Sequence, residues 1–141
     1  MKVFIAYKHT GEDPDKLKKN LEIISNIFTA IGYDTFIFFR DIQDWGKVTT
    51  PPEQVMSIAL KKQQDCSHVF AYINNFEISE GLSLEVGYAK ALNKKLIIGI
   101  SKSLPQDSHM LLLGLGADII KFKNLKDLCT QIPKFFEQIE R

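Results

Sequence analysis

A glycine and a glutamate four residues apart form the spacing in this chain that most directly suggests chemistry. Gly81 and Glu85 lie within residues 79–93, where the sequence pattern predicts a helix, and helical residues four apart share one face. Helical side chains lean toward the helix N-terminus, so the Glu85 carboxylate is expected over the turn that contains Gly81. The glycine leaves room there for a ligand. A carboxylate in this position can act as a nucleophile or stabilise a cationic sugar.

The residue that opens this helix suggests an anion site. Ser79 suits the N-cap position, where its hydroxyl satisfies one of the free amides of the first turn. The remaining free amides, together with the helix dipole, favour the binding of an anion. Spacing alone leaves two simpler interpretations open, because Glu85 can be an ordinary solvated glutamate and Ser79 can be only a cap.

Five β-type segments alternate with four helical segments along the chain. The strands are predicted at residues 3–7, 33–39, 69–73, 96–100 and 118–122, and the helices at 17–31, 53–64, 79–93 and 125–139. Residues 40–52 are predicted to form a long loop, and residues 101–113 an irregular connection that can include a helical turn. The alternation of strands and helices implies parallel strand pairing with right-handed crossovers.

These elements predict one α/β domain over residues 1–141, a flavodoxin-like three-layer sandwich with a parallel sheet of about five strands. The apolar middle strands fit a sheet that helices cover on both faces. Ligands of such sheets bind beyond the carboxyl ends of the strands, where the strand order reverses. The loops after Tyr7, Phe39 and Ile73 are therefore expected to meet at the site.

Composition argues against several classes of partner and cofactor. The 141 residues carry a net charge of +1, which gives no electrostatic footprint for nucleic acid or an anionic membrane. The two cysteines form no CxxC motif and the three histidines have no ligand spacing, so no metal site is expected. The sequence has no Walker loop or GxGxxG motif, and we expect no cofactor. The N-terminal segment fits a strand and is too short for a signal peptide, which makes the cytoplasm the expected location.

Residues 79–95 resemble the active-site helix of the nucleoside 2-deoxyribosyltransferase family, in which a glycine-containing turn leads into an E-x-G-x-A helix. The similarity extends over residues 65–128. It implies that Glu85 attacks the anomeric carbon of a nucleoside or deoxynucleoside. The chain is then expected to be an enzyme that cleaves or exchanges the N-glycosidic bond through a glycosyl-glutamate intermediate.

The chain departs from the transferases of this family at several positions. Ser57 and Ser79 stand where the transferases carry aspartates, and residues 7–11 are polar where the family favours small residues. A serine at position 79 resembles the related 2′-deoxynucleoside 5′-monophosphate N-glycosidases, whose serine helps to hold the 5′-phosphate. Lys8, His9 and Thr10 can bind phosphate as well, or can simply be solvated.

The expected substrate-binding residues are Tyr7, Lys8, His9, Asn74, Ser79, Gly81 and His109, around Glu85 as the catalytic residue. The expected substrate is a nucleoside or a nucleoside 5′-monophosphate. The sequence does not indicate the preferred base, the choice between ribose and deoxyribose, or whether the acceptor is water or a second base.

A second resemblance implies a different function. Residues 3–7 with the polar loop that follows are similar to the opening of Toll/interleukin-receptor (TIR) domains, which also place a glutamate six residues after a serine. Some TIR domains hydrolyse NAD, and others only assemble signalling complexes. Gly81-Leu82 replaces the tryptophan–cysteine pair typical of that helix, so this alternative ranks second. A non-catalytic nucleotide-binding protein is the third alternative.

Residues 109–113, His-Met-Leu-Leu-Leu, are very apolar for a surface connection. An exposed apolar patch usually marks an interface, and in the family that the chain resembles a neighbouring subunit completes the pocket through this segment. A homodimer or a larger even-numbered oligomer is therefore expected, with His109 close to the partner's ligand. The alternative is that these leucines fold under the edge of the sheet.

Overall fold

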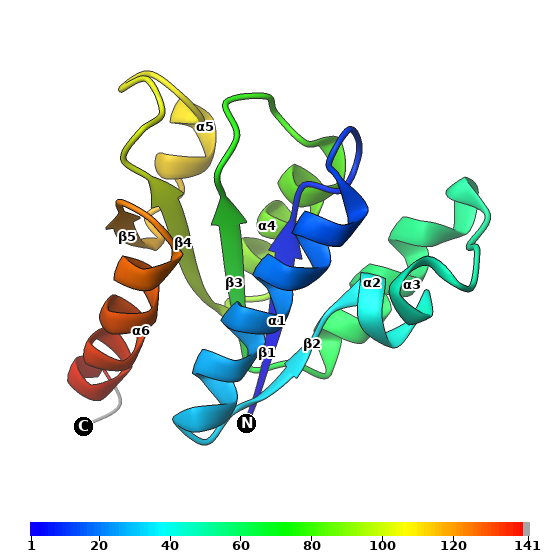
Figure 1. Cartoon of the computed structure of the whole chain (residues 1–141), viewed down its shortest axis with the longest axis horizontal. Helices are drawn as coiled ribbons and strands as arrows, with labels where there is room; N and C mark the ends of the chain where they lie inside the picture. Colours follow the sequence, from blue (N-terminus) through cyan, green and yellow to red (C-terminus); the bar gives the residue numbers. More distant parts are fainter. Residues whose placement is uncertain (140–141) are drawn as a thin grey trace.

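Five parallel strands form one sheet at the centre of the molecule (Figure 1). The structure, a computed structural model, describes residues 1–139. The strands are β1 (Lys2–Tyr7), β2 (Asp34–Phe36), β3 (His68–Ile73), β4 (Lys95–Ser101) and β5 (Asp118–Phe122). Their order in the sheet is β2-β1-β3-β4-β5, and every neighbouring pair is parallel. The predicted flavodoxin-like α/β architecture is confirmed.

Helices cover both faces of the sheet and enclose two apolar cores. The helices are α1 (Pro14–Ala30), α2 (Phe38–Asp41), α3 (Pro52–Gln64), α4 (Glu80–Ala91), α5 (Met110–Leu113) and α6 (Leu125–Ile139), with a 3-10 turn η1 (Asp44–Gly46). Helices α1 and α6 pack on one face, and α3 and α4 on the other (Figure 1). Val3 and Ile5 of β1 enter the first core, while Phe4 and Ala6 enter the second. Within residues 1–139, no helix is long and apolar enough to cross a membrane.

A glycine in β4 makes room for an aromatic side chain of the central strand β3. A Cβ atom at Gly99 of β4 would lie 2.7 Å from Cζ of Phe70 in β3. The ring of Phe70 in turn contacts Phe28 of α1, with 5.4 Å between the ring centroids. The middle strands can therefore pack tightly against α1, which gives the site a rigid base.

The second strand is shorter than the sequence predicts. Strand β2 ends at Phe36, and Phe38–Asp41 form the helical turn α2, so the predicted strand through Phe39 is wrong in its second half. Strand β2 is an edge strand that pairs with β1 over three residues, and the chain leaves this pairing after Phe36 although β1 continues to Tyr7. The Asp41 carboxylate instead accepts the N–H of Ile37 at 2.9 Å and closes the turn.

The strand order reverses between β1 and β3. The chain leaves β1 toward β2 on one side and returns to β3 on the other, so the connections after β1 and β3 diverge. Ligands of such sheets bind at this point, at the carboxyl ends of the strands. The predicted long loop over residues 40–52 lies next to it and contains the turn η1, and the irregular segment over residues 101–113 contains the single turn α5.

Candidate active site

An open cleft with a volume of about 370 Å³ lies at the carboxyl end of β1, between the α2–η1 segment, α3 and α4. Five of the predicted site residues line it: Tyr7, His9, Ser79, Gly81 and Glu85. The other lining residues are Thr10, Phe38, Gln43, Thr50, Pro52, Val55 and Met56. A mostly apolar cleft of this size, with a few convergent polar groups, is typical of a small-molecule site.

Glu85 is a buried glutamate that faces this cleft. Its side chain belongs to α4 and the residue is 8% exposed. Within residues 1–139, its carboxyl group makes no hydrogen bond or ion pair. Burial away from water raises the pKa of Glu85 to about 8, because desolvation disfavours the charged form. Burial therefore keeps a proton on this carboxyl group at neutral pH.

Two glutamines anchor the helix behind Glu85. Gln63 of α3 donates from Nε2 to the backbone oxygen of Glu85 at 2.9 Å, and Gln64 donates to the Tyr88 hydroxyl at 2.6 Å. The Gln63 side chain is fully buried, and its Oε1 has no hydrogen-bond partner among residues 1–139. Sequence reasoning missed this contact. A signal was present, because Gln63 lies four residues after the buried Ala59 and so shares its face of α3.

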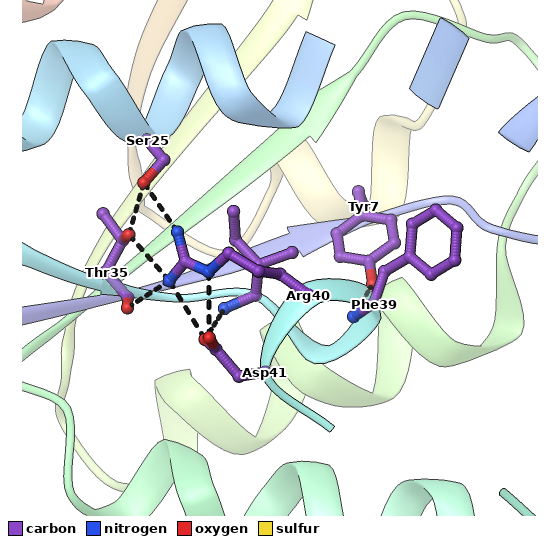
Figure 2. Close-up of polar contacts among 7 residues, drawn as sticks. Tyr7, Ser25, Thr35, Phe39, Arg40 and Asp41 are labelled. Carbon is purple, nitrogen blue, oxygen red and sulfur yellow. Dashed lines mark hydrogen bonds and ion pairs between the residues drawn. The ribbon is translucent and has the colours of Figure 1, made fainter. Parts of the chain in front are cut away.

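Tyr7 closes the cleft at the end of β1. Its hydroxyl oxygen accepts the backbone N–H of Phe39 at 2.8 Å (Figure 2). Burial raises the pKa of Tyr7 well above its usual range, and the nearby Glu85 charge adds to the increase. The Tyr7 phenol therefore stays protonated. Its hydrogen bond with Phe39, 32 positions away in the sequence, fixes the position of the ring.

The turn that supplies this amide is itself held by a polar network (Figure 2). Arg40 donates to Ser25 Oγ of α1 at 3.0 Å and to the backbone oxygen of Thr35 in β2 at 2.8 Å. Its Nε also lies 2.9 Å from Oδ1 of Asp41. A planar guanidinium can hold several acceptors in one fixed geometry. The network fixes α2, and with it Phe38, which lines the cleft.

Ser79 lies between the cleft and a second, much smaller cavity. Its hydroxyl oxygen accepts the N–H of Leu82 at 3.2 Å, as expected for the N-cap of α4. The small cavity has a volume of about 10 Å³, the space of one water molecule. The predicted site residues Lys8, Asn74 and His109 line this cavity and not the cleft.

Lys8 and His109 are both engaged within the chain. The Lys8 ammonium lies 3.7 Å from the carboxylates of both Glu12 and Glu77, so its charge is largely balanced. The ring of His109 is buried, and its Nε2 donates to the backbone oxygen of Asn75 at 2.8 Å. The other ring nitrogen has no hydrogen-bond partner among residues 1–139. The His109 side chain therefore contacts residues of its own chain and is not exposed to a neighbouring subunit.

One of the two positions at which an aspartate is expected from the resemblance, Ser57, lies outside the cleft, whereas the other, Ser79, lines it. Ser57 is exposed on α3, and its hydroxyl donates to the backbone oxygen of Gln54 at 3.1 Å. Glu85 is therefore the one carboxyl group among the described residues that line the cleft. Residues 1–139 contain no group of three or more side chains suited to a metal ion.

Comparison with solved structures gives whole-chain matches. A CMP N-glycosidase from Clostridium botulinum is 18% identical, with a TM-score of 0.68, over 96% of this chain and 99% of that chain. A 2-deoxyribosyltransferase from Leishmania mexicana is 16% identical, with a TM-score of 0.71, over 99% of both chains. A 2-deoxyribosyltransferase from Bacillus psychrosaccharolyticus is 14% identical, with a TM-score of 0.59, over 91% of this chain and 90% of that chain.

The TM-scores of these matches show a shared fold. No protein-family profile matches the sequence, and no curated protein matches it. A shared fold does not by itself give a shared function, so the chemistry has to be inferred from the cleft.

The buried carboxyl group makes a prediction about stability. Because the pKa of Glu85 is raised in the folded protein, the folded state keeps this proton to higher pH than the unfolded state does. The stability gained from the neutral carboxyl is fully present at acidic pH and is lost as the pH rises through about 8. Urea unfolding should show wild type losing roughly 4 kcal/mol relative to Glu85→Gln between pH 5 and pH 8.

The matched control removes a solvated carboxylate from the same helix. Glu80 is exposed in the first turn of α4, and Glu80→Gln should follow the pH dependence of wild type. A Glu85→Gln protein whose stability also changes with pH as wild type does would show that Glu85 titrates normally.

Proposed function

We propose that this chain cleaves or exchanges the N-glycosidic bond of a nucleoside, a deoxynucleoside or one of their 5′-monophosphates, with Glu85 as the nucleophile. The observation that carries the proposal is a buried carboxyl group without a hydrogen-bond partner among residues 1–139, facing a cleft of about 370 Å³. Gly81 lies one turn earlier on the same helix and lines the same cleft. Gly81 presents no side chain of its own to the cleft, and the space above it is bounded by the flexible Met56 side chain, whose Cε would lie 3.3 Å from a Cβ at Gly81.

The reaction follows from this geometry. An oxygen of the Glu85 carboxylate attacks the anomeric carbon while the bond from that carbon to the base breaks, which leaves a glycosyl ester. Water as the acceptor then gives hydrolysis, and a second base gives exchange. The developing positive charge on the sugar favours the ionised carboxylate, so the substrate itself opposes the effect of burial on this group.

The structural comparisons support the same class of chemistry. The solved structures that share the fold over nearly the whole chain are named as a CMP N-glycosidase and 2-deoxyribosyltransferases. All these names describe proteins that act at the bond between a sugar and a base. The proposal for this chain combines that similarity with the position of Glu85 in the cleft.

A 5′-phosphate is best placed at the start of α4. The Ser79 hydroxyl oxygen accepts from Leu82, which leaves its own hydrogen free to donate to an anion. The free backbone amides in the first turn of α4 also favour the binding of an anion. Lys8 contributes little charge, because Glu12 and Glu77 already surround its ammonium. Ser79 and these amides are therefore our proposed phosphate ligands.

We also propose that the chain forms a homo-oligomer through the apolar residues beside the small cavity. Leu111 is 90% exposed and Met110 is 61% exposed, while Phe76 and Ile78 of the neighbouring loop are exposed as well. Exposed apolar side chains gathered at one end of a sheet are typical of an interface. Because His109 is turned inward, a partner would meet Met110 and Leu111 first.

Removing the carboxylate tests the proposed function. Glu85→Gln keeps the size of the side chain but loses the nucleophile, and should lower base release by at least about a thousandfold. The assay incubates the protein with deoxynucleosides, their 5′-monophosphates and NAD, and separates the bases released. Glu80→Gln, which removes the carboxylate next to the cap, should retain turnover.

Each outcome of this assay is informative. Near wild-type turnover in a folded Glu85→Gln protein would remove the assignment of the nucleophile. Release from NAD alone would favour the TIR-like alternative. No release from any substrate would favour a nucleotide-binding protein without catalytic activity.

The phosphate site makes a separate prediction about Ser79. Ser79→Ala removes a donor to the phosphate, so KM for the monophosphate should rise about tenfold while KM for the nucleoside changes little. Steady-state kinetics on a matched nucleoside and monophosphate measure the difference. Equal changes in both KM values would reduce Ser79 to a helix cap.

A further inference from the structure

Cleavage of an N-glycosidic bond needs a proton for the departing base as well as a nucleophile. Among the described residues that line the cleft, the ionisable side chains are Tyr7, His9 and Glu85. Glu85 is committed to the sugar. Tyr7 has a pKa well above its usual range, which makes it a poor acid. Ser57, at the position where an aspartate would be expected, lies outside the cleft.

His9 is placed at the cleft with a free ring. It follows β1 by two residues, and its ring packs edge-on against Phe39 with 4.8 Å between the centroids and 90° between the planes. The ring of Tyr7 lies 6.4 Å away. Within residues 1–139 neither ring nitrogen of His9 makes a hydrogen bond, although the ring lines the cleft. Aromatic contacts therefore hold the imidazole while its nitrogens remain available to a ligand.

The charged side chains next to His9 pair with one another and not with its ring. Lys8 is the next residue in the chain, and its ammonium is balanced by Glu12 and Glu77. No carboxylate forms an ion pair with His9 among the described residues. Burial lowers the pKa of His9 from its ordinary value. Imidazole is the side chain whose ordinary pKa suits it both to give up and to take back a proton, and a bound anion would offset the effect of burial on His9.

We propose that His9 is the proton donor to the departing base, a role that rests on the proposed function of Glu85. In the first step a Glu85 oxygen bonds to the anomeric carbon, and the electron pair of the breaking carbon–nitrogen bond goes to the base. The imidazolium of His9 protonates that nitrogen and becomes neutral. In the second step neutral His9 takes a proton from the attacking water, the ester bond to Glu85 breaks, and the imidazolium is restored.

The two side chains form a coupled pair in this scheme. Glu85 and His9 line the same cleft, and one proton divides between them without changing the total charge. Burial raises the pKa of Glu85 and lowers that of His9, so burial favours the neutral pair. Pairs whose pKa values are separated by their environment are typical of acid–base assignments. A bound phosphate would favour the ion pair by stabilising imidazolium.

The test compares two leaving groups on the same sugar. One substrate is a deoxynucleoside 5′-monophosphate, and the other is 4-nitrophenyl 2-deoxyriboside 5′-phosphate, whose nitrophenolate departs without a proton. His9→Ala and His9→Gln should lower kcat on the nucleotide by a factor on the order of 10²–10³ and on the nitrophenyl substrate by less than about threefold. Added imidazole should restore part of the nucleotide activity of His9→Ala.

The outcomes separate this inference from the proposed function. Equal losses on both substrates, or unchanged turnover of the nucleotide, would overturn the role of His9. Glu85→Gln should lose both substrates, because the nucleophile is needed whatever the leaving group. If wild type releases neither leaving group, the proposed function fails, and the role of His9 fails with it. Urea unfolding of both His9 variants checks that each is folded.

Discussion

The burial of one carboxyl group is the constraint on which the cleft depends. Glu85 is 8% exposed, makes no hydrogen bond through its carboxyl group among residues 1–139, and has its pKa raised to about 8. Leaving a carboxylate without a partner costs free energy, and a fold that served only stability would fill this position with an apolar residue. The cost is consistent with a group kept ready for a ligand that supplies the missing charge.

The surrounding structure fixes this group from two sides. Gln63 holds the backbone of Glu85 from α3, behind the cleft. In front, Arg40 ties the turn α2 to α1 and β2, and the amide of Phe39 in that turn holds Tyr7. Reacting groups need rigid positions because small displacements are costly in rate. In the proposed reaction, residues that line no part of the cleft, such as Gln63 and Arg40, would fix the positions of the groups that do.

Local patterns in the sequence were sufficient for the architecture and for the helix that carries Glu85. Alternating strands and helices gave the parallel sheet, and Ser79 opens α4 as its capping chemistry predicts. The turn α2 was missed because Phe38 and Phe39 have strand-forming side chains. The bonds that hold the turn, from Ile37 N–H to Asp41 and from Phe39 N–H to Tyr7, are not visible in the local pattern. Lys8 and His9 are neighbours in the sequence, but Lys8 lines the small cavity and His9 lines the cleft. Lys8 forms ion pairs with Glu12 and Glu77, which the local sequence pattern does not reveal.

The central claim is that Glu85 bonds covalently to the sugar. A deoxynucleotide analogue with fluorine at the 2′-arabino position should form this glycosyl ester, and the fluorine should slow its breakdown so that the ester accumulates. Mass spectrometry of the digested protein should then show the mass of the fluorosugar phosphate on the peptide that contains Glu85. If the protein turned over the nucleotide, gave a product with inverted configuration at the anomeric carbon, and formed no adduct, these results would contradict the account.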